Sequence, residues 1–121
     1  MARKKILVVD DEQFNRDLMA QILEEEYDLV MAVDGQEALD KATQERPDLI
    51  LMDLGMPGLD GWDATRQIKA NDTLNHIPII AVTSHAMIGE EAKAREVGCD
   101  DYMPKPVDED GLIQRIKNYL S

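Results

Sequence analysis

Five residues suited to binding a cation and a phosphate occur at one kind of position, at or just after the end of a short apolar segment. They are Asp10, Asp11, Asp53, Thr83 and Lys105. Carboxylates that gather in one place repel one another, so at least one of them resists ionisation. A hard divalent cation removes this conflict, and oxygen ligands select Mg²⁺ or Ca²⁺ over softer metals. These residue types therefore indicate a divalent-cation site beside an ammonium and a hydroxyl.

The same residues suit phosphoryl transfer. Mg²⁺ commonly takes one or two protein carboxylates and shares the oxygens of a substrate phosphate. The charges of three carboxylates, one Mg²⁺ and the Lys105 ammonium sum to zero. A carboxylate can accept a phosphoryl group covalently, and cations on the transferring oxygens assist the step. An ionised carboxylate has no proton to lose, so the reaction needs no general base.

Each residue has an ordinary structural explanation when taken alone. An Asp after a strand commonly forms a turn or caps a helix, as Asp11 could do for the segment that follows it. A lone Lys such as Lys105 is usually a solvated charge. The chemical interpretation therefore depends on whether the fold brings these residues to one place.

Short β-rich segments alternate with amphipathic segments along the whole chain. The predicted strands cover residues 5–9, 29–33, 49–52, 79–82 and, weakly, 102–103. The predicted helices cover residues 13–26, a segment from 34, 61–70, 87–97 and a segment from 108. This alternation predicts an α/β fold of βαβ units around a parallel sheet. In such sheets the ligand crevice lies outside the carboxyl ends of the strands, where all five residues would meet.

Local signals support these elements. The first helix places four apolar side chains on one face, namely Phe14, Leu18, Ile22 and Leu23. Asp34 is a good N-cap for the second helix, with Glu37 as its capping-box partner. The fourth helix has only a thin apolar stripe and ends at Gly98, a common C-cap.

Bulk composition limits the possible functions. The 121 residues fit one domain, 1–121, and the net charge of −12 opposes binding to nucleic acid or anionic lipid. No apolar segment approaches the roughly 20 residues that span a bilayer, and the start of the chain is not a signal peptide. The lone Cys99 forms no internal disulfide and is expected to be a small core residue. We expect a cytoplasmic protein with no nucleic-acid or membrane partner.

Four segments together resemble the receiver domains of two-component response regulators. They are Val9-Asp10-Asp11, Leu51-Met52-Asp53-Leu54-Gly55-Met56-Pro57-Gly58-Leu59-Asp60-Gly61, Ile80-Ala81-Val82-Thr83-Ser84 and Tyr102-Met103-Pro104-Lys105-Pro106. The resemblance covers the whole chain. It implies a five-stranded parallel sheet with helices on both faces, doubly wound in the flavodoxin-like order 2-1-3-4-5.

The resemblance also implies a metal site and a nucleophile. Asp53 would be the phosphoacceptor and become an aspartyl phosphate. Asp11 and Asp53 would ligate Mg²⁺ together with the backbone carbonyl of Gly55, and Asp10 would act mostly through a water molecule. Mn²⁺ can substitute for Mg²⁺ in this interpretation.

The remaining implied roles belong to the switch. Thr83 would donate its hydroxyl to a phosphoryl oxygen, and Tyr102 would swing inward when Thr83 moves. Lys105 would pair with Asp53 before transfer and with the phosphoryl group after it, held by a cis bond to Pro106. The expected output surface is helix 87–97 with residues 102–104 and the outer side of the last helix.

Two further positions concern how long the phosphate survives. In the family, the side chains at the positions of Gly55 and His85 tune the loss of the phosphate. Gly55 has no side chain, so the lifetime is open here. The ordinary interpretation of His85, and of His76, is a surface histidine.

The resulting expectation is a stand-alone response regulator in a phosphorelay, not a turnover enzyme. Its partners would be a histidine kinase or histidine phosphotransfer protein and a downstream target protein. The alternatives are a relay intermediate that passes phosphate to a histidine phosphotransfer protein, or a receiver fragment of a hybrid sensor kinase.

Other protein classes fit the sequence less well. A haloacid-dehalogenase-type phosphatase needs a second Asp where Gly55 stands, and no P-loop is present. A flavodoxin needs a phosphate loop after the first strand, where Asp11 and Glu12 would repel the ligand. A pseudo-receiver without phosphoryl chemistry usually lacks one of the acids or the lysine, and this chain has them all.

Overall fold

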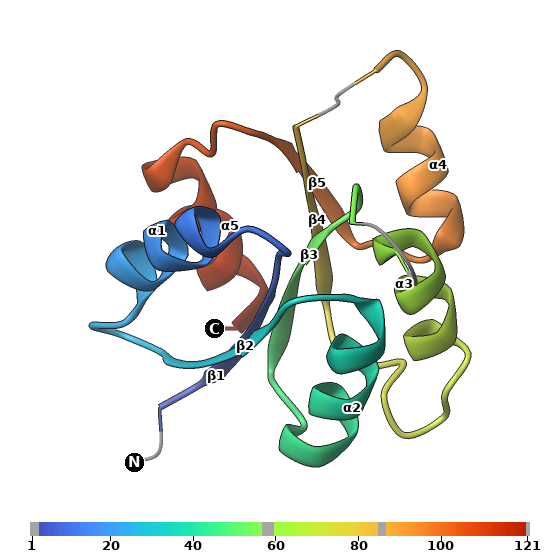
Figure 1. Ribbon diagram of the computed structural model, residues 1–121, viewed down its shortest axis with the longest axis horizontal. Coiled ribbons are helices and arrows are strands. Elements are labelled where there is room, and N and C mark those ends of the chain that lie inside the picture. The colour runs from blue at the N-terminus through green and yellow to red at the C-terminus, as the bar shows by residue number, and fades with distance from the viewer. Residues whose placement is uncertain (1–2, 57–59, 85–86, 121) are drawn as a thin grey trace.

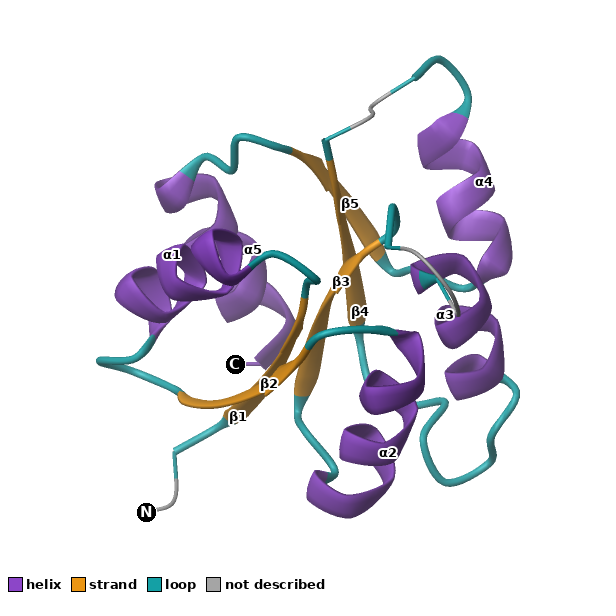
Figure 2. Cartoon of the chain, in the orientation of Figure 1, coloured by secondary structure: helices purple, strands orange, loops and turns teal. Residues whose placement is uncertain are grey.

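The computed structural model describes residues 3–56, 60–84 and 87–120, so His85 lies outside the described residues. Strands and helices alternate from one end of the chain to the other (Figures 1 and 2). The strands are β1 (Lys5–Val9), β2 (Asp28–Ala32), β3 (Leu49–Asp53), β4 (Ile79–Thr83) and β5 (Asp101–Pro104). The helices are α1 (Gln13–Leu23), α2 (Gly35–Glu45), α3 (Gly61–Lys69), α4 (Glu90–Val97) and α5 (Glu109–Leu120).

The five strands form one parallel sheet in the order β2-β1-β3-β4-β5, which confirms the predicted topology. Helices α1 and α5 cover one face of the sheet, and α2, α3 and α4 cover the other (Figure 1). The strand order reverses between β1 and β3, whose register pairs Val9 with Met52. The residues that follow these two strands therefore meet at the switch point, where doubly wound sheets bind their ligands.

Two apolar cores hold the sheet between its helix layers. On the α2–α4 side the core includes Leu7 and Ile50, and on the α1–α5 side it includes Ile6 and Leu51. Every residue of β3 is buried, as the continuous apolar sequence of a strand covered on both faces predicts. The central strands therefore form a rigid base for the residues at their ends.

Two helix starts are specified locally. In α2 the Asp34 side chain accepts a hydrogen bond from the Glu37 backbone N–H at 2.8 Å, and Glu37 Oε1 accepts one from Val33 at 3.0 Å. The predicted N-cap at Asp34 is thus confirmed, whereas Glu37 reaches back to the N–H of Val33, one residue before the N-cap, and not to that of Asp34 as in a capping box. In α3 a side chain at Gly61 would collide with the carbonyl oxygen of Asp53. Only glycine lets α3 begin this close to the end of β3.

The structure corrects two expectations about the helices. Phe14, predicted to lie on the packed face of α1, is 74% exposed, and Leu18 is exposed as well. The buried residues of α1 are Met19 and Leu23. Helix α4 begins at Glu90 and not at residue 87, because Gly89 takes the left-handed conformation (φ 86°) at its N-cap.

Cys99 is buried, which confirms its assignment to the core. Burial raises the pKa of its thiol to about 11. Within the described ranges, no helix is both long enough and apolar enough to span a membrane.

Candidate functional site

Three aspartates converge at the carboxyl edge of the two central strands. Asp10 and Asp11 follow β1, and Asp53 ends the neighbouring strand β3. Each offers a carboxylate oxygen, and these oxygens all lie within 4.8 Å of one another. Carboxylates this close repel one another unless a cation lies between them, and oxygen donors suit Mg²⁺. The donor set therefore fits the divalent cation that the sequence predicts.

The three acids are held differently. Asp10 is buried, and its Oδ1 accepts a hydrogen bond from the Glu12 backbone N–H at 2.9 Å. Asp53 is also buried, and its Oδ1 accepts one from the Gly55 backbone N–H at 3.0 Å. Asp11 is exposed to solvent. Two fixed carboxylates and one accessible carboxylate thus form the cluster.

Lys105 reaches the cluster from the loop after β5. Its Nζ lies 2.7 Å from Asp10 Oδ2 and 3.5 Å from Asp53 Oδ2. The Lys105 backbone N–H donates to the Thr83 carbonyl at 2.7 Å, and the Lys105–Pro106 peptide bond is cis. The expected proximity to Asp53 is present, although the shorter contact is to Asp10.

Burial and charge shift the titration of this group. Burial is the largest influence on Asp53 and raises its pKa. The hydrogen bond from Gly55 and the charge of Lys105 lower it, whereas the charges of Asp10 and Asp11 raise it. A cation bound here would counter the repulsion of Asp53 by the charges of Asp10 and Asp11. The site is therefore most strained electrostatically when no cation is bound.

The ammonium remains charged in spite of its burial. Burial is the largest influence on Lys105 and acts to lower its pKa. The hydrogen bond to Asp10 and the charges of Asp53 and Asp10 outweigh it, so the pKa of Lys105 lies above its usual value. Lys105 is therefore a fixed cation beside the cluster at neutral pH.

Thr83 and Gly55 border the space beside Asp53. Thr83 ends β4 and is buried, and its neighbour Val82 pairs with Asp53 in the sheet register. A Cβ at Gly55 would lie 3.8 Å from Asp53 Oδ1, so the glycine leaves that side of the carboxylate uncovered. Ser84, after Thr83, is exposed. A ligand can therefore approach Asp53 past small residues.

Tyr102 lies in β5, away from the acids. Its side chain is buried, and its hydroxyl donates a hydrogen bond of 2.8 Å to Glu90 Oε1 in α4. Burial and this contact with Glu90 raise the pKa of Tyr102 to about 12, so the hydroxyl stays protonated. The tyrosine is thus already packed inward and joined to α4. The sequence did not single out Glu90. It lies twelve residues before Tyr102, and the pair Glu90-Glu91 is typical of a solvated helix surface.

The exposed side chains of α1 line a cavity that the sequence did not predict. Its volume is about 370 Å³, and it extends from Phe14 and Leu18 to Ser84, Lys105 and Val107. Helical periodicity shows that Phe14 and Leu18 share a face, but it does not show how far that face is covered. The cavity joins an apolar surface to the lysine of the acidic cluster.

Comparisons with known sequences agree with this geometry. The family model described as the response regulator receiver domain matches residues 6–117. The polar-differentiation response regulator DivK of Brucella anthropi is 42% identical over 118 residues, which are 97% of this chain and 96% of that protein. DivK of Brucella ovis is 40% identical with the same coverage.

Solved structures with the same fold include a response regulator from Chloroflexus aurantiacus, with a TM-score of 0.92 and 28% identity over 98% of both chains. The receiver domain of a sensor histidine kinase from Pseudomonas aeruginosa has a TM-score of 0.90 and 33% identity, again over 98% of both chains. That receiver was solved with a magnesium ion coordinated in its active-site cleft.

Proposed function

The chain belongs to the response regulator receiver domain family, and we propose that it is a switch that accepts a phosphoryl group on Asp53 and thereby changes a protein-binding surface. The observation that supports this most directly is the meeting of Asp10, Asp11 and Asp53 within 4.8 Å, with Lys105 against two of them. Transfer to and loss from Asp53 would be the only chemistry, so the protein is not a turnover enzyme.

The metal would be held by side-chain oxygens of the three aspartates and by the Gly55 carbonyl. When bound, Mg²⁺ or Mn²⁺ supplies positive charge to the oxygens of the group being transferred. The Gly55 N–H holds Asp53 Oδ1 at 3.0 Å. This contact restrains the carboxylate, so Asp53 would need little rotation to meet a phosphorus atom.

The transfer step is a displacement at phosphorus. A bond forms between a carboxylate oxygen of Asp53 and the phosphorus, and the bond from phosphorus to the donor's imidazole nitrogen breaks. The imidazole leaves with that electron pair. Lys105, whose Nζ lies 3.5 Å from Asp53 Oδ2, and the hydroxyl of Thr83 would stabilise the phosphoryl oxygens, which is how proteins assist this reaction.

The donor would dock on α1. The α1 cavity places the exposed Phe14 and Leu18 beside Lys105, and so beside the acids. A histidine on a helix of a kinase or phosphotransfer protein could bury its apolar neighbours there while its phosphorylated ring reaches Asp53. We therefore assign this cavity to the phosphodonor.

The signal would leave through the other helix layer. A phosphoryl group adds about −1.5 to −2 of charge in place of the single charge of Asp53, and the surplus attracts new donors. If Thr83 moved toward the phosphoryl group, it would vacate space next to β5. The side chain of Tyr102 could then move into that space. The expected output surface is α4 with residues 102–104 and the outer side of α5. Relay to a histidine phosphotransfer protein is a second candidate, favoured by the likeness to the sensor-kinase receiver domain.

Intact-mass spectrometry after incubation with acetyl phosphate tests the proposal. We expect one added phosphoryl group with Mg²⁺ or Mn²⁺, none with a chelator, and none on Asp53→Asn under any condition. Equal labelling of Asp53→Asn would contradict the assignment. Loss of the label to a histidine phosphotransfer protein would distinguish relay from a terminal switch.

A further inference from the structure

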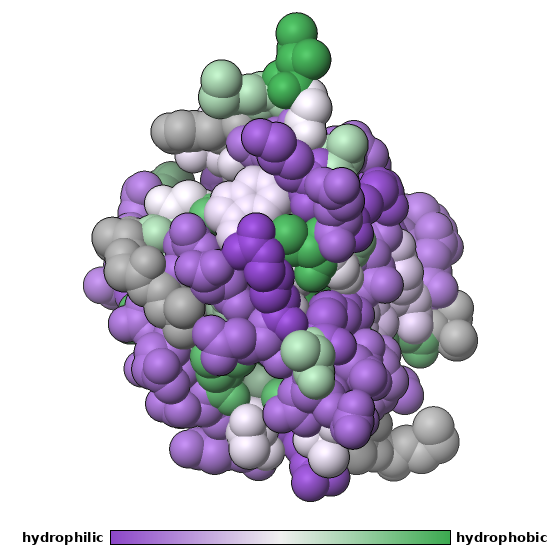
Figure 3. Space-filling view, turned by 90° about the vertical axis from the view of Figure 1, so that its right-hand side faces the viewer, coloured by the Kyte–Doolittle hydropathy of each residue, from purple (hydrophilic) through white to green (hydrophobic). Residues whose placement is uncertain are grey.

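A second cavity lies between α3 and α4, on the side of the molecule opposite α1 (Figures 1 and 3). Its volume is about 550 Å³. We call it the α3–α4 groove, and its main lining residues are Trp62, Arg66, Met87, Ile88, Lys93 and Val97. In the space-filling view of this side, apolar and pale side chains gather amid charged ones (Figure 3).

The apolar part of the groove is unusually exposed. Trp62 and Val97 are half-buried, while Met87 is 73% and Ile88 107% exposed in the segment before α4. Six large apolar side chains are exposed in the described part of the chain, and four of them lie at the α1 cavity or at this groove. Clustered exposed apolar residues mark interaction sites more often than single ones do.

The charges of the groove differ from those of the whole chain. The chain carries 25 acidic and 13 basic side chains, whereas the groove is lined by Arg66 and Lys93 against Glu90 and Glu96. Glu90 is already engaged by the hydroxyl of Tyr102. The Tyr102 hydroxyl is neutral, so Glu90 keeps its charge, and the groove has as many cations as anions on a chain with 25 acidic and 13 basic side chains.

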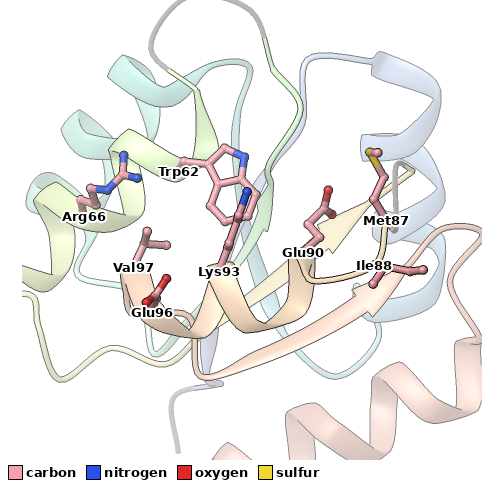
Figure 4. A pocket seen from close by; sticks show the side chains of 8 residues that line it. All are labelled: Trp62, Arg66, Met87, Ile88, Glu90, Lys93, Glu96 and Val97. Carbon is pink, nitrogen blue, oxygen red and sulfur yellow. The ribbon is translucent and has the colours of Figure 1, made fainter.

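The two cations are free to accept a partner. Lys93 forms no side-chain ion pair with the described residues, and it extends from α4 toward the indole of Trp62 (Figure 4). Among residues 3–56, 60–84 and 87–120, Arg66 pairs only with Asp63, three residues earlier on the same helix, and both side chains are exposed. Such surface pairs contribute little, so Arg66 can exchange Asp63 for another carboxylate at low cost.

We propose that the α3–α4 groove binds an amphipathic helix of a partner protein that places a bulky apolar side chain against Trp62 and Val97 and a carboxylate against Lys93. Grooves between two helices are a common receptor for such segments. A second copy of this chain is a poorer occupant, because two chains of net charge −12 repel.

The groove is connected to the proposed switch. Glu90 lines the groove and accepts a hydrogen bond from the hydroxyl of Tyr102. A movement of Tyr102 would therefore release or displace the Glu90 side chain. This coupling rests on the proposed function, whereas binding by the groove does not.

The test uses a capped helical peptide that carries Leu and Phe one turn apart with a Glu on the same face. The matched control peptide has Lys in place of Glu. We expect the acidic peptide to change the emission of Trp62, the only tryptophan in the chain, and to shift amide NMR signals of α3 and α4. Lys93→Glu should weaken binding roughly tenfold, because it reverses a charge at the contact. Lys117→Glu, the same change on exposed α5, should not.

Ile88→Ser is a second variant that leaves the fold intact, because Ile88 is fully exposed, and it should also weaken binding. Equal binding of both peptides, shifts confined to α1, or self-association that occupies the groove without peptide would each overturn the proposal. Asp53→Asn must still bind the peptide. Loss of binding with normal phosphorylation refutes the groove alone, and loss of phosphorylation with normal binding refutes the proposed function alone.

Discussion

The acidic cluster and α4 are built in opposite ways. Asp10 and Asp53 extend from central strands, and β3 is buried at every residue. Helix α4 buries only Ala94 among its residues Glu90–Val97. Phosphoryl transfer depends on fixed positions, whereas a switch needs an element that moves at low cost. In the proposed function, chemistry and signalling would therefore be divided between a rigid edge and a loosely packed helix.

Helix α4 is also unequal along its own length. At its C-terminal end Arg95 donates to the Asp100 carbonyl at 2.9 Å and lies 3.5 Å from the Asp101 carboxylate. At its N-terminal end Glu90 accepts a hydrogen bond of 2.8 Å from the Tyr102 hydroxyl in β5. From the thin apolar stripe, the sequence predicted only that this helix is poorly anchored. The structure favours a pivot about the Arg95 end, with the Glu90 end free to move.

The largest effect is expected when Lys105, the fixed cation of the acidic cluster, is removed. Lys105→Ala should slow phosphorylation by acetyl phosphate roughly 10²-fold to 10³-fold, as loss of a preorganised charge does elsewhere. It should also destabilise the fold by about 3 kcal/mol, because Asp10 would be left buried without its cation. Time-resolved mass spectrometry and urea unfolding measure the two effects. A rate near that of the native protein would show that Lys105 is not part of the site.

A smaller effect concerns the metal. Mg²⁺ at ten times its Kd should stabilise the protein by about 1.4 kcal/mol. Asp11→Ala should remove most of this gain and raise the metal-free melting temperature, because the crowding of Asp11, Asp10 and Asp53 is relieved. Thermal unfolding with and without Mg²⁺ measures both changes, with the exposed Asp40→Ala on α2 as control. An undiminished Mg²⁺ effect in Asp11→Ala would exclude Asp11 as a ligand.

The third prediction concerns the pivot. Tyr102→Phe removes the hydroxyl that reaches Glu90 and should cost about 1 kcal/mol of stability. Hydrogen exchange should quicken in the first turn of α4 and stay slow near Arg95. Arg95→Ala should give the reverse pattern. Uniform exchange along α4 in both variants would mean that the helix moves as a whole.

The smallest expected effect is the pH dependence of Asp53. Because its folded-state pKa is raised, the folded protein binds this proton more readily than the unfolded chain. Asp53 therefore lowers metal-free stability as pH rises through the folded-state pKa. Well below 3.8, the pKa of an unperturbed aspartate, the group is protonated in both states and the penalty vanishes. Asp53→Asn should accordingly be more stable than the native chain at neutral pH and equal to it in acid. A constant difference at all pH values would contradict the raised pKa.

The sequence predicted most of what local chemistry and strand pattern determine. The alternation of elements, the N-cap at Asp34 and the convergence of the acids follow from residue types in order. The strand order came from the family resemblance. The exposure of Phe14 and the partner of Tyr102 were missed, because periodicity orients a helix without showing what covers it. The late start of α4 depends on the left-handed conformation of Gly89, which a glycine permits but does not require.

The most direct test of the division between rigid site and mobile helix is Thr83→Ala. Amide NMR spectra would be compared before and after activation by acetyl phosphate or beryllofluoride with Mg²⁺. Mass spectrometry would confirm that Asp53 still accepts phosphate. We predict that the native protein shows shifts at residues 87–97 and 102–104, and that the variant is phosphorylated but lacks these shifts. Shifts equal to those of the native protein would contradict transmission through Thr83, even with Asp53 phosphorylated.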